Sequence, residues 1–397
     1  MKYFIFSLFI LNILYFIIQY ILYTRYKVCS INNNYCPKLS VIIPVFNEEK
    51  YIVKTIKSVL KSEYNNEIEI IIINDGSTDN TENVVKDFIN FIEPINIENR
   101  KIHFISFFRN RGKRTAIYEA VKFSHSDIIV TLDSDTIINE DALLNLVQPF
   151  NDEKVGAVAG NIKINNHENI FSSMLEAAFC FGFGFLRPAQ SSIGSVLCTP
   201  GALSAYRKSV IIDDLEEWKN QMFLFHPAII GEDRALTNIV LNKNYKVLYQ
   251  ENSIAYTNVP NTFFGMINMF IRWIRGDIRE SFILFKLIFK KNTVYNKSLT
   301  IFNLIMQFIW LLSSFLIVYF VYSVIISSTY LIFCTCFTFL MLFWSILPIY
   351  ICVIKHSVKL GLISVIYSFF NACVLFWIIP YCWITLYSSS WITRKSE

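Results

Sequence analysis

The chain has 397 residues, of which 54% are hydrophobic and 17% are charged, and this balance excludes an ordinary soluble protein. It carries 36 basic and 31 acidic residues, for a formal net charge of +5. Most of this excess lies in the two terminal segments, so the block from Thr24 to Lys297 is nearly neutral. A nucleic-acid partner is therefore not predicted, because binding a duplex needs a concentrated basic face.

Three long runs without Asp, Glu, Lys or Arg predict membrane-spanning helices: Tyr3–Tyr23, Ser298–Ile354 and Leu360–Thr393. A bilayer core takes about 20 apolar helical residues, so the runs are long enough for one, two and one spans. The first run predicts an uncleaved anchor over residues 1–24, because no small-residue cleavage site follows it. The other runs predict about three C-terminal spans within residues 298–393, the last of them broken near Pro380.

Basic residues beside these runs indicate the orientation of the chain. Arg25 and Lys27 follow the first run, and Lys355, His356 and Lys359 lie between the last two spans. Cytoplasmic loops of membrane proteins carry an excess of Lys and Arg. The sequence therefore predicts a multi-pass protein of the plasma or inner cell membrane, with the block between the spans in the cytoplasm.

Residues 38–260 alternate short β-branched runs with helix-compatible stretches. The expected strands are LSVIIPV from Leu39, EIEIIIIND from Glu67, IHFISFF from Ile102 and DIIVTLDSD from Asp127, and the expected helices are Glu48–Lys61, Thr78–Asn90 and Gly112–Phe123. This alternation predicts an α/β domain with a mainly parallel sheet, in which ligands bind beyond the carboxyl ends of the strands. Residues 261–297 mix apolar and basic residues, as expected of amphipathic helices at a membrane interface.

Polar residues follow the first two expected strands. The segments are Pro44-Val45-Phe46-Asn47-Glu48 and Asn74-Asp75-Gly76-Ser77-Thr78-Asp79. Each is also compatible with a plain turn or a helix cap, since Asn, Asp, Gly and Ser are turn formers. Together, at neighbouring strand ends, they predict a site that holds a nucleoside through carboxylate hydrogen bonds to the base and the ribose.

Two carboxylates, Asp133 and Asp135, emerge at the tip of the fourth expected strand. Residues two apart in a strand point to the same side, so the carboxylates are expected to lie together. They repel each other unless a cation neutralises them, and hard oxygen ligands favour Mg²⁺ or Mn²⁺. A lone Asp-x-Asp pair is common by chance. Its place after an apolar strand favours a metal that bridges to a diphosphate.

Three other segments have both a structural and a functional interpretation. Arg109–Arg114 is a cationic loop that opens a helix, where it can attract an anion or simply be solvated. In Gly231–Arg234 a carboxylate after an apolar stretch can act as a general base, or it can belong to a helix N-terminus with a salt bridge. Trp273 can stack on a sugar ring and Arg272 can bind phosphate, although both residue types are also common at membrane interfaces.

The order and spacing of these motifs resemble the family 2 inverting glycosyltransferases of the processive membrane type, above all hyaluronan synthases and chitooligosaccharide synthases. The resemblance covers about Lys38 to Ser281. Its narrower motifs are Gly112-Lys113-Arg114, Asp133-Ser134-Asp135-Thr136, Arg187-Pro188-Ala189-Gln190-Ser191, Tyr206-Arg207, Gly231-Glu232-Asp233-Arg234-Ala235-Leu236-Thr237, and Arg272-Trp273 followed by Arg279-Glu280.

The resemblance implies specific roles for individual residues. It implies that the donor, a UDP-sugar, is held by Phe46, Glu48, Asp75, Lys113, Asp133 and Arg272. It implies that the acceptor sugar is bordered by Cys198, Thr199, Gly201 and Trp273. Asp135 is expected to bind the metal, Mg²⁺ or Mn²⁺, and Asp233 is expected to be the catalytic base. Two positions depart from the family pattern: Met269 stands in place of Gln in Gln-x-x-Arg-Trp, and Cys198-Thr199-Pro200-Gly201 inverts the usual Gly-Pro order.

The resemblance further implies a cytoplasmic α/β domain of the GT-A-like type on a base of transmembrane helices. The implied reaction transfers a sugar, with N-acetylglucosamine the best candidate, from a UDP-sugar to a growing β-linked polysaccharide at the cytoplasmic membrane face. One alternative is a transferase that moves a single sugar to a polyprenyl phosphate. A second, from another class, is a catalytically inactive membrane scaffold or a transporter, and the lack of charges in the three long runs disfavours transport.

Overall fold

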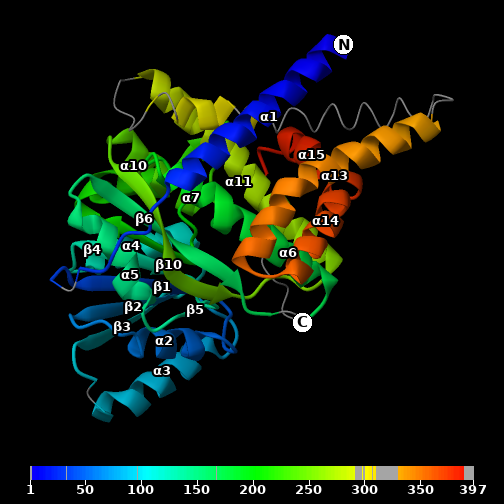
Figure 1. Ribbon diagram of the computed structural model, residues 1–397. Coiled ribbons are helices and arrows are strands. Elements are labelled where there is room, and N and C mark those ends of the chain that lie inside the picture. Colours follow the sequence, from blue (N-terminus) through cyan, green and yellow to red (C-terminus); the bar gives the residue numbers. More distant parts are fainter. Residues whose placement is uncertain are drawn as a thin grey trace.

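The computed structural model describes residues 2–388 except 33, 96, 167, 291–296, 298–299, 306 and 310–329. Within these residues the protein is organised around an eight-stranded sheet with the strand order β3-β2-β1-β4-β7-β6-β10-β5 (Figure 1). The strands are β1 Leu39–Val45, β2 Ile68–Asn74, β3 Arg100–Ser106, β4 Ile128–Leu132, β5 Ile137–Ile138, β6 Val155–Ile164, β7 Leu203–Arg207 and β10 Lys246–Thr257. The sheet lies where the sequence predicts an α/β domain.

The first half of the sheet is parallel, as predicted. β1 pairs with β2 from Leu39 opposite Ile68 and with β4 from Leu39 opposite Ile128, and β3 continues the parallel order beside β2. Every residue of β1, β2 and β4 is buried, so these strands are mostly apolar along their length and do not alternate between buried and exposed residues. Their common direction brings the polar residues that follow them to one edge of the sheet.

The second half of the sheet is mixed, which differs from the mainly parallel sheet expected. β7 runs antiparallel to β4 and to β6, β6 runs parallel to β10, and β5 runs antiparallel to β10. The cause is the path of the chain, which enters β7 at Leu203, opposite Leu132 at the carboxyl end of β4. The segment before β7 therefore crosses the edge at which the polar strand ends gather.

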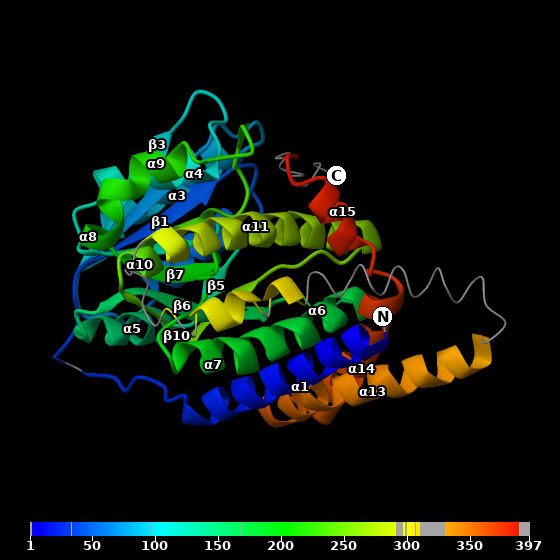
Figure 2. The same ribbon diagram turned by 90° about the horizontal axis from the view of Figure 1, so that it is seen from above.

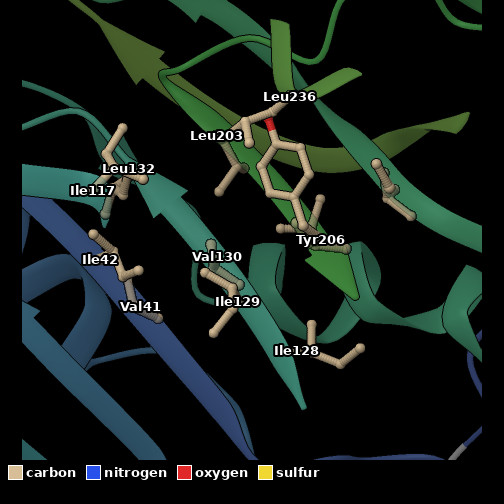
Figure 3. Close-up of a cluster of buried hydrophobic side chains, with 14 of the residues drawn as sticks. Val41, Ile42, Ile117, Ile128, Ile129, Val130, Leu132, Leu203, Tyr206 and Leu236 are labelled. Atoms are coloured by element: carbon tan, nitrogen blue, oxygen red, sulfur yellow. The ribbon is translucent and has the colours of Figure 1, made fainter. Parts of the chain in front are cut away.

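Helices cover the sheet and complete its core. They are α2 Ile52–Leu60, α3 Thr81–Ile92, α4 Lys113–Phe123, α5 Ala142–Val147, α8 Lys208–Ile211, α9 Leu215–Lys219 and α10 Glu232–Asn242. α2 and α3 start a few residues later than predicted, because the polar segments before them form hydrogen-bonded loops. Side chains of β1, β4 and β7 pack with Ile117 of α4 and Leu236 of α10 (Figure 3). This packing fixes the first turns of both helices at the same sheet edge.

A second layer consists of long helices on one side of the sheet domain (Figures 1 and 2). It contains α1 Lys2–Arg25, α6 Ile170–Phe181, a π-helical turn Gly182–Leu186, α7 Arg187–Ser191, α13 Tyr330–Lys355, α14 Val358–Cys373 and α15 Ile378–Ile384. α1 lies along α7, and α6 contacts α13 and α14. α11, Phe263–Lys290, lies between this layer and the sheet domain and contacts α10 and α15 (Figure 2). The interface segment predicted over residues 261–297 is thus mostly one helix.

The apolar helices overlap only partly with the predicted spans. In the described part of the chain, one helix is long and apolar enough to cross a membrane, Ile170–Ser191, and a second is obtained if α14 and α15, bent by 46°, count as one span. Ile10–Arg25 and Met341–Lys355 form shorter apolar helices. The break between α14 and α15 lies just before Pro380, where a break was expected.

Two differences from the sequence expectations concern these spans. Ile170–Ser191 was not predicted as a span, because Glu176 and Arg187 interrupt the charge-free run on which the prediction depended. Of the run Ser298–Ile354, in which two spans were predicted, residues 310–329 lie outside the described residues, and the part from Tyr330 onward belongs to α13. The multi-pass arrangement therefore stays a prediction.

Candidate active site

A small pocket opens at the carboxyl ends of β1 and β4 and is walled by the first turns of α4 and α10. Its polar lining consists of Lys113, Thr131, Asp133, Gly201, Tyr206, Glu232 and Asp233. Four of these residues, Lys113, Asp133, Gly201 and Asp233, were predicted from segments far apart in the sequence. The structure brings them together. Glu232 was not predicted as a site residue, although it stands next to the predicted base.

Lys113 links the two sides of the pocket. Its Nζ lies 2.7 Å from Asp133 Oδ1 and 2.8 Å from Glu232 Oε1. Burial alone lowers the pKa of the Lys113 ammonium, but the two carboxylates outweigh burial and raise it above its usual value, so the lysine stays charged. A Cβ at Gly201 would lie 2.8 Å from Lys113 Nζ, so a side chain at this position would displace the lysine.

The two acids at the start of α10 differ in their surroundings. Burial raises the pKa of Asp233 to about 6, and the neighbouring charge of Glu232 adds to this effect. Burial acts on Glu232 in the same direction, but the ion pair with Lys113 outweighs it and lowers the pKa of Glu232 to about 2. One carboxylate is therefore held ionised, while the other is poised to exchange a proton near neutral pH.

Backbone and thiol groups orient the Asp233 carboxylate. The amide of Gly201 donates to Asp233 Oδ2 at 3.2 Å, and the amide of Arg234 donates to Oδ1 at 2.7 Å. The Cys198 thiol lies 3.8 Å from Oδ2. Gly201 and Cys198, both predicted to border the acceptor, thus contact the predicted base. The carboxylate retains lone pairs with which it can accept a proton from a bound hydroxyl.

The Thr199 side chain, unlike the Cys198 thiol and the Gly201 amide, does not contact the Asp233 carboxylate. Its side chain is fully buried, and its hydroxyl lies 2.7 Å from the hydroxyls of both Tyr206 and Thr237. This hydroxyl is therefore not free to bind a sugar. It ties the loop before β7 to α10 and so supports the wall that carries Cys198 and Gly201.

The two loops predicted to hold the nucleoside are hydrogen-bonded to each other. The Asn47 amide donates to Ser77 Oγ at 3.0 Å, and the Thr78 amide donates to Asn47 Oδ1 at 2.8 Å. The Glu48 amide donates to Thr81 Oγ1 at 2.9 Å. Phe46 and Glu48 are half-buried at this junction. The polar ends of β1 and β2 converge, as expected from the sequence.

Asp75 is buried and its carboxylate is already bonded to the chain. The amides of Arg111 and Gly112 donate to its two oxygens at 2.7 and 2.9 Å. A Cβ on the next residue, Gly76, would lie 2.4 Å from the carbonyl carbon of Arg109, so only glycine permits this contact. Asp75 thus anchors the basic loop that opens α4. It thereby fixes the position from which Lys113 extends.

Asp135 lies at the end of β4, two residues after Asp133, and both are half-buried. Its Oδ1 accepts a hydrogen bond from Thr257 Oγ1 at 3.4 Å. Among the described residues, no group of three or more His, Cys, Asp and Glu side chains could hold a metal ion. A divalent cation such as Mg²⁺ usually needs only one or two protein carboxylates when a substrate phosphate supplies further oxygens. The carboxylate oxygens of Asp133 and Asp135 are of the kind that such a cation prefers, and the role of Asp135 as its ligand stays a prediction.

Arg272 and Trp273 lie on α11 outside the pocket lining. Trp273 is 39% exposed, and its ring packs against Phe179 and Phe270, with centroids 5.9 and 6.1 Å apart. One turn further along α11, Gly276 lies against Gly231, since a Cβ on Gly276 would be 3.3 Å from the Gly231 Cα. The two glycines let α11 approach the first turn of α10, so the Arg-Trp segment starts one helical turn from that contact.

Sequence reasoning missed two buried polar networks beside the pocket. Arg234 lies 2.6 Å from Asp277 and donates to Ser281 and Gln307. Arg114 donates to Gln221 at 2.7 Å, and Gln221 donates to Glu280 at 2.9 Å. Arg114, Arg234 and Glu280 stand inside motifs that were recognised, but only the fold reveals which residues they meet.

Comparisons with known proteins agree with this architecture. The chain matches Glycosyl transferase family 2 over residues 40–215 and Glycosyl transferase family group 2 over residues 128–389. It belongs to glycosyltransferase family 2. This confirms the family resemblance of the sequence motifs.

Within this family, the chain is similar to two named relatives. The chain is 36% identical over 253 residues to a hyaluronan synthase of Streptococcus pyogenes, covering 63% of this chain and 59% of the relative. It is 31% identical over 258 residues to an N-acetylglucosaminyltransferase of Azorhizobium caulinodans, covering 64% and 63%. The matched region thus spans less than two thirds of either relative.

A solved structure supports the fold. A mannosyltransferase of Pyrobaculum calidifontis, determined with GDP-Man and Mn²⁺, superposes with a TM-score of 0.64 over 92% of this chain and 98% of the other at 16% identity. At that identity the likeness concerns the fold alone. The GT-A-like domain expected from the sequence is therefore confirmed, with a mixed sheet.

Proposed function

We propose that this protein is an inverting glycosyltransferase that transfers a sugar from a UDP-sugar to a growing β-linked polysaccharide. N-acetylglucosamine is the proposed sugar, because the relatives are named as a hyaluronan synthase and an N-acetylglucosaminyltransferase. The single observation that carries the proposal is the pocket in which Asp233 faces Lys113 and Asp133. Asp233, with its raised pKa, can take the proton of a neutral acceptor hydroxyl. Lys113, beside Asp133, can stabilise the charge of the donor.

The proposed reaction is one in-line displacement at the anomeric carbon. Asp233 accepts the proton of the attacking acceptor hydroxyl while the bond to the UDP oxygen breaks. Attack on the face opposite an α-linked nucleotide inverts the configuration and gives a β bond. Lys113 lies 2.7 Å from Asp133, where it can face the negative charge that develops on the departing diphosphate.

The donor site is proposed around this centre. Phe46, Glu48 and Asp75 stand at the joined ends of β1 and β2, where the nucleoside would lie. Asp133 would contact the nucleotide, and Arg272 the diphosphate. Asp135 would bind Mg²⁺ or Mn²⁺, which would neutralise the diphosphate charge when bound.

The acceptor is proposed to reach Asp233 between the loop before β7 and α11. Cys198 and Gly201 contact the carboxylate of the base. The half-exposed Trp273 offers a flat apolar ring on which a sugar can stack. Thr199 would support this site through the wall behind it.

The helical layer is proposed to lie in the cell membrane, with the catalytic domain in the cytoplasm. The exposed side chains of α1 include Ile10, Leu14, Ile17 and Ile21, which recur at helical spacing and form one apolar stripe. Arg25 ends α1, as expected where a helix leaves a membrane on its cytoplasmic side.

The Asp233→Asn variant tests the reaction. We expect it to bind UDP nearly as the wild type does, because its shape is retained, while transfer falls by about 10²- to 10⁴-fold with the loss of the base. Radiolabelled sugar incorporation and calorimetric UDP binding measure the two quantities. Asp213→Asn, an exposed acid of the same type, serves as the matched control. Normal turnover in Asp233→Asn would remove the assigned base.

Product sizing separates the proposed polymerase from the rival that modifies a polyprenyl phosphate. Purified protein in detergent is incubated with a panel of UDP-sugars and Mg²⁺ or Mn²⁺, and the products are weighed by mass spectrometry. A ladder of β-linked sugars supports polymerisation. A single sugar on an added polyprenyl phosphate would favour the rival, and no metal-dependent UDP binding would favour an inactive scaffold.

A further inference from the structure

The pocket holds one cation and three carboxylates. Among its lining residues, Lys113 is the sole cation, and Asp133, Glu232 and Asp233 are the acids. Lys113 already contacts two of these acids, at 2.7 and 2.8 Å. The single positive charge of Lys113 is thus already shared by two carboxylates, and a diphosphate that approaches the lysine has to share that charge with them. A diphosphate and these carboxylates therefore compete for one lysine.

Glu232 is the competitor with the least freedom to move away. It is 7% exposed, and its backbone carbonyl accepts a hydrogen bond from Trp218 Nε1 at 3.0 Å. The preceding residue, Gly231, is left-handed at φ 83° and packs against Gly276 of α11. The backbone of Glu232 is thus anchored at a position from which its side chain reaches Lys113.

We propose that Glu232 is a positioning residue that competes with the diphosphate of UDP for Lys113 and so promotes the release of UDP after transfer. This inference rests on the proposed function and extends it to the step after chemistry. With the donor bound, Lys113 is drawn towards the diphosphate at the expense of its contact with Glu232. Once the sugar has left, the lysine returns to Glu232, and the UDP loses its partner.

The test measures UDP binding, which does not depend on turnover. Glu232→Gln keeps the shape of the side chain but removes its charge, so we expect the dissociation constant of UDP to fall about tenfold, as for other close charge pairs. Isothermal titration of the full-length protein, with and without Mn²⁺, measures it. We expect Glu232→Asp, which keeps the charge, to bind UDP as the wild type does. Stronger UDP product inhibition and a lower kcat are expected in Glu232→Gln alone.

A matched control uses another acid that is paired with a lysine. Glu216, on α9, lies 2.9 Å from Lys219 and outside the pocket. Glu216→Gln should leave UDP affinity unchanged. If it tightens UDP binding as much as Glu232→Gln does, the effect is one of overall charge and the proposal is overturned.

A double-mutant cycle decides whether Glu232 acts through Lys113. In the Lys113→Met background, the tightening caused by Glu232→Gln should shrink to less than about threefold, because no lysine is left to compete for. Equal tightening in both backgrounds would mean direct repulsion between Glu232 and UDP and would overturn the proposal. Unchanged or weaker UDP binding in Glu232→Gln would also overturn it. By contrast, a wild-type protein that neither binds UDP nor transfers sugar would sink the proposed function itself.

Discussion

At the scale of single residues, the site depends on two neighbouring acids that the fold treats differently. Glu232 is neutralised by Lys113, whereas Asp233 is bonded only to backbone amides and lies near a thiol. Adjacent residues in one helical turn therefore differ in pKa, about 2 against about 6. The pair resembles other acid–base sites, in which unlike environments give two carboxyl groups unlike roles.

The raised pKa of Asp233 predicts how transfer depends on pH. A base must be ionised, so as the pH falls through about 6 the protonated fraction grows and kcat/KM should drop about tenfold per unit below that point. If the pKa of Asp233 had its ordinary value of 3.8, the enzyme would stay active to a much lower pH. Rates measured from about pH 5 to about pH 8, with UDP binding followed in parallel, check this. A rate that stays constant down to about pH 5 would contradict it.

At the scale of elements, the decisive contact joins α10 and α11. Gly231 and Gly276 let the two helices meet without side chains between them. Polar networks reinforce the contact, because Arg234 of α10 pairs with Asp277 of α11. Asn238 of α10 likewise donates to Glu280 of α11 at 2.9 Å. The base and the Arg-Trp segment are thus held by one rigid pair of helices.

Substitutions at Gly276 test this contact. Gly276→Ala should be tolerated, because its Cβ would meet atoms at 3.3 Å or more, which a small shift relieves. Gly276→Leu should force the helices apart, cost about 1–3 kcal/mol of unfolding free energy and lower kcat more than UDP affinity. Thermal unfolding and steady-state kinetics measure both effects. A leucine variant with wild-type kcat would show that the spacing of α10 and α11 is unimportant for transfer.

At the scale of the whole molecule, a buried sheet domain is joined to a layer of apolar helices (Figure 2). α11 lies between the two parts and contributes residues to both. Its Ile278 and Met269 pack in the apolar cluster shared with α15. Its Glu280 accepts hydrogen bonds from Gln221 and Asn238 of the sheet domain. The proposed transfer site thus lies beside the proposed membrane boundary, where a polymer and a lipid surface can both be reached.

The apolar stripe of α1 tests the membrane assignment. The double variant Leu14→Asp/Ile17→Asp should raise the fraction of protein extracted from membranes by alkaline carbonate, because each Asp in a spanning helix costs about 3 kcal/mol. Phe91→Asp/Ile95→Asp, at exposed apolar positions of the sheet domain, should leave the fraction unchanged. If both double variants behave alike, α1 does not lie in the bilayer.

Much of the fold was predictable because its signals are local. β1, β2 and β4 are short β-branched runs, and each ends in a polar cluster whose position follows from the strand direction. The Asp133-Ser134-Asp135 pair follows a buried strand, as expected, and the loops at Asn47 and Thr78 meet, as expected. The antiparallel β7 was missed, because strand direction depends on where the preceding loop crosses the sheet.

The sequence alone determined the family, the strands β1 to β4 and the residues that gather at one edge, since these depend on patterns within a few residues of each other. Only the tertiary structure decided that Lys113 pairs with Glu232, that Thr199 is buried, and that Ile170–Ser191 is a long apolar helix. The reason is physical. Burial and charge pairing depend on distances between segments more than 100 residues apart, as between Lys113 and Glu232, and no local pattern encodes those distances.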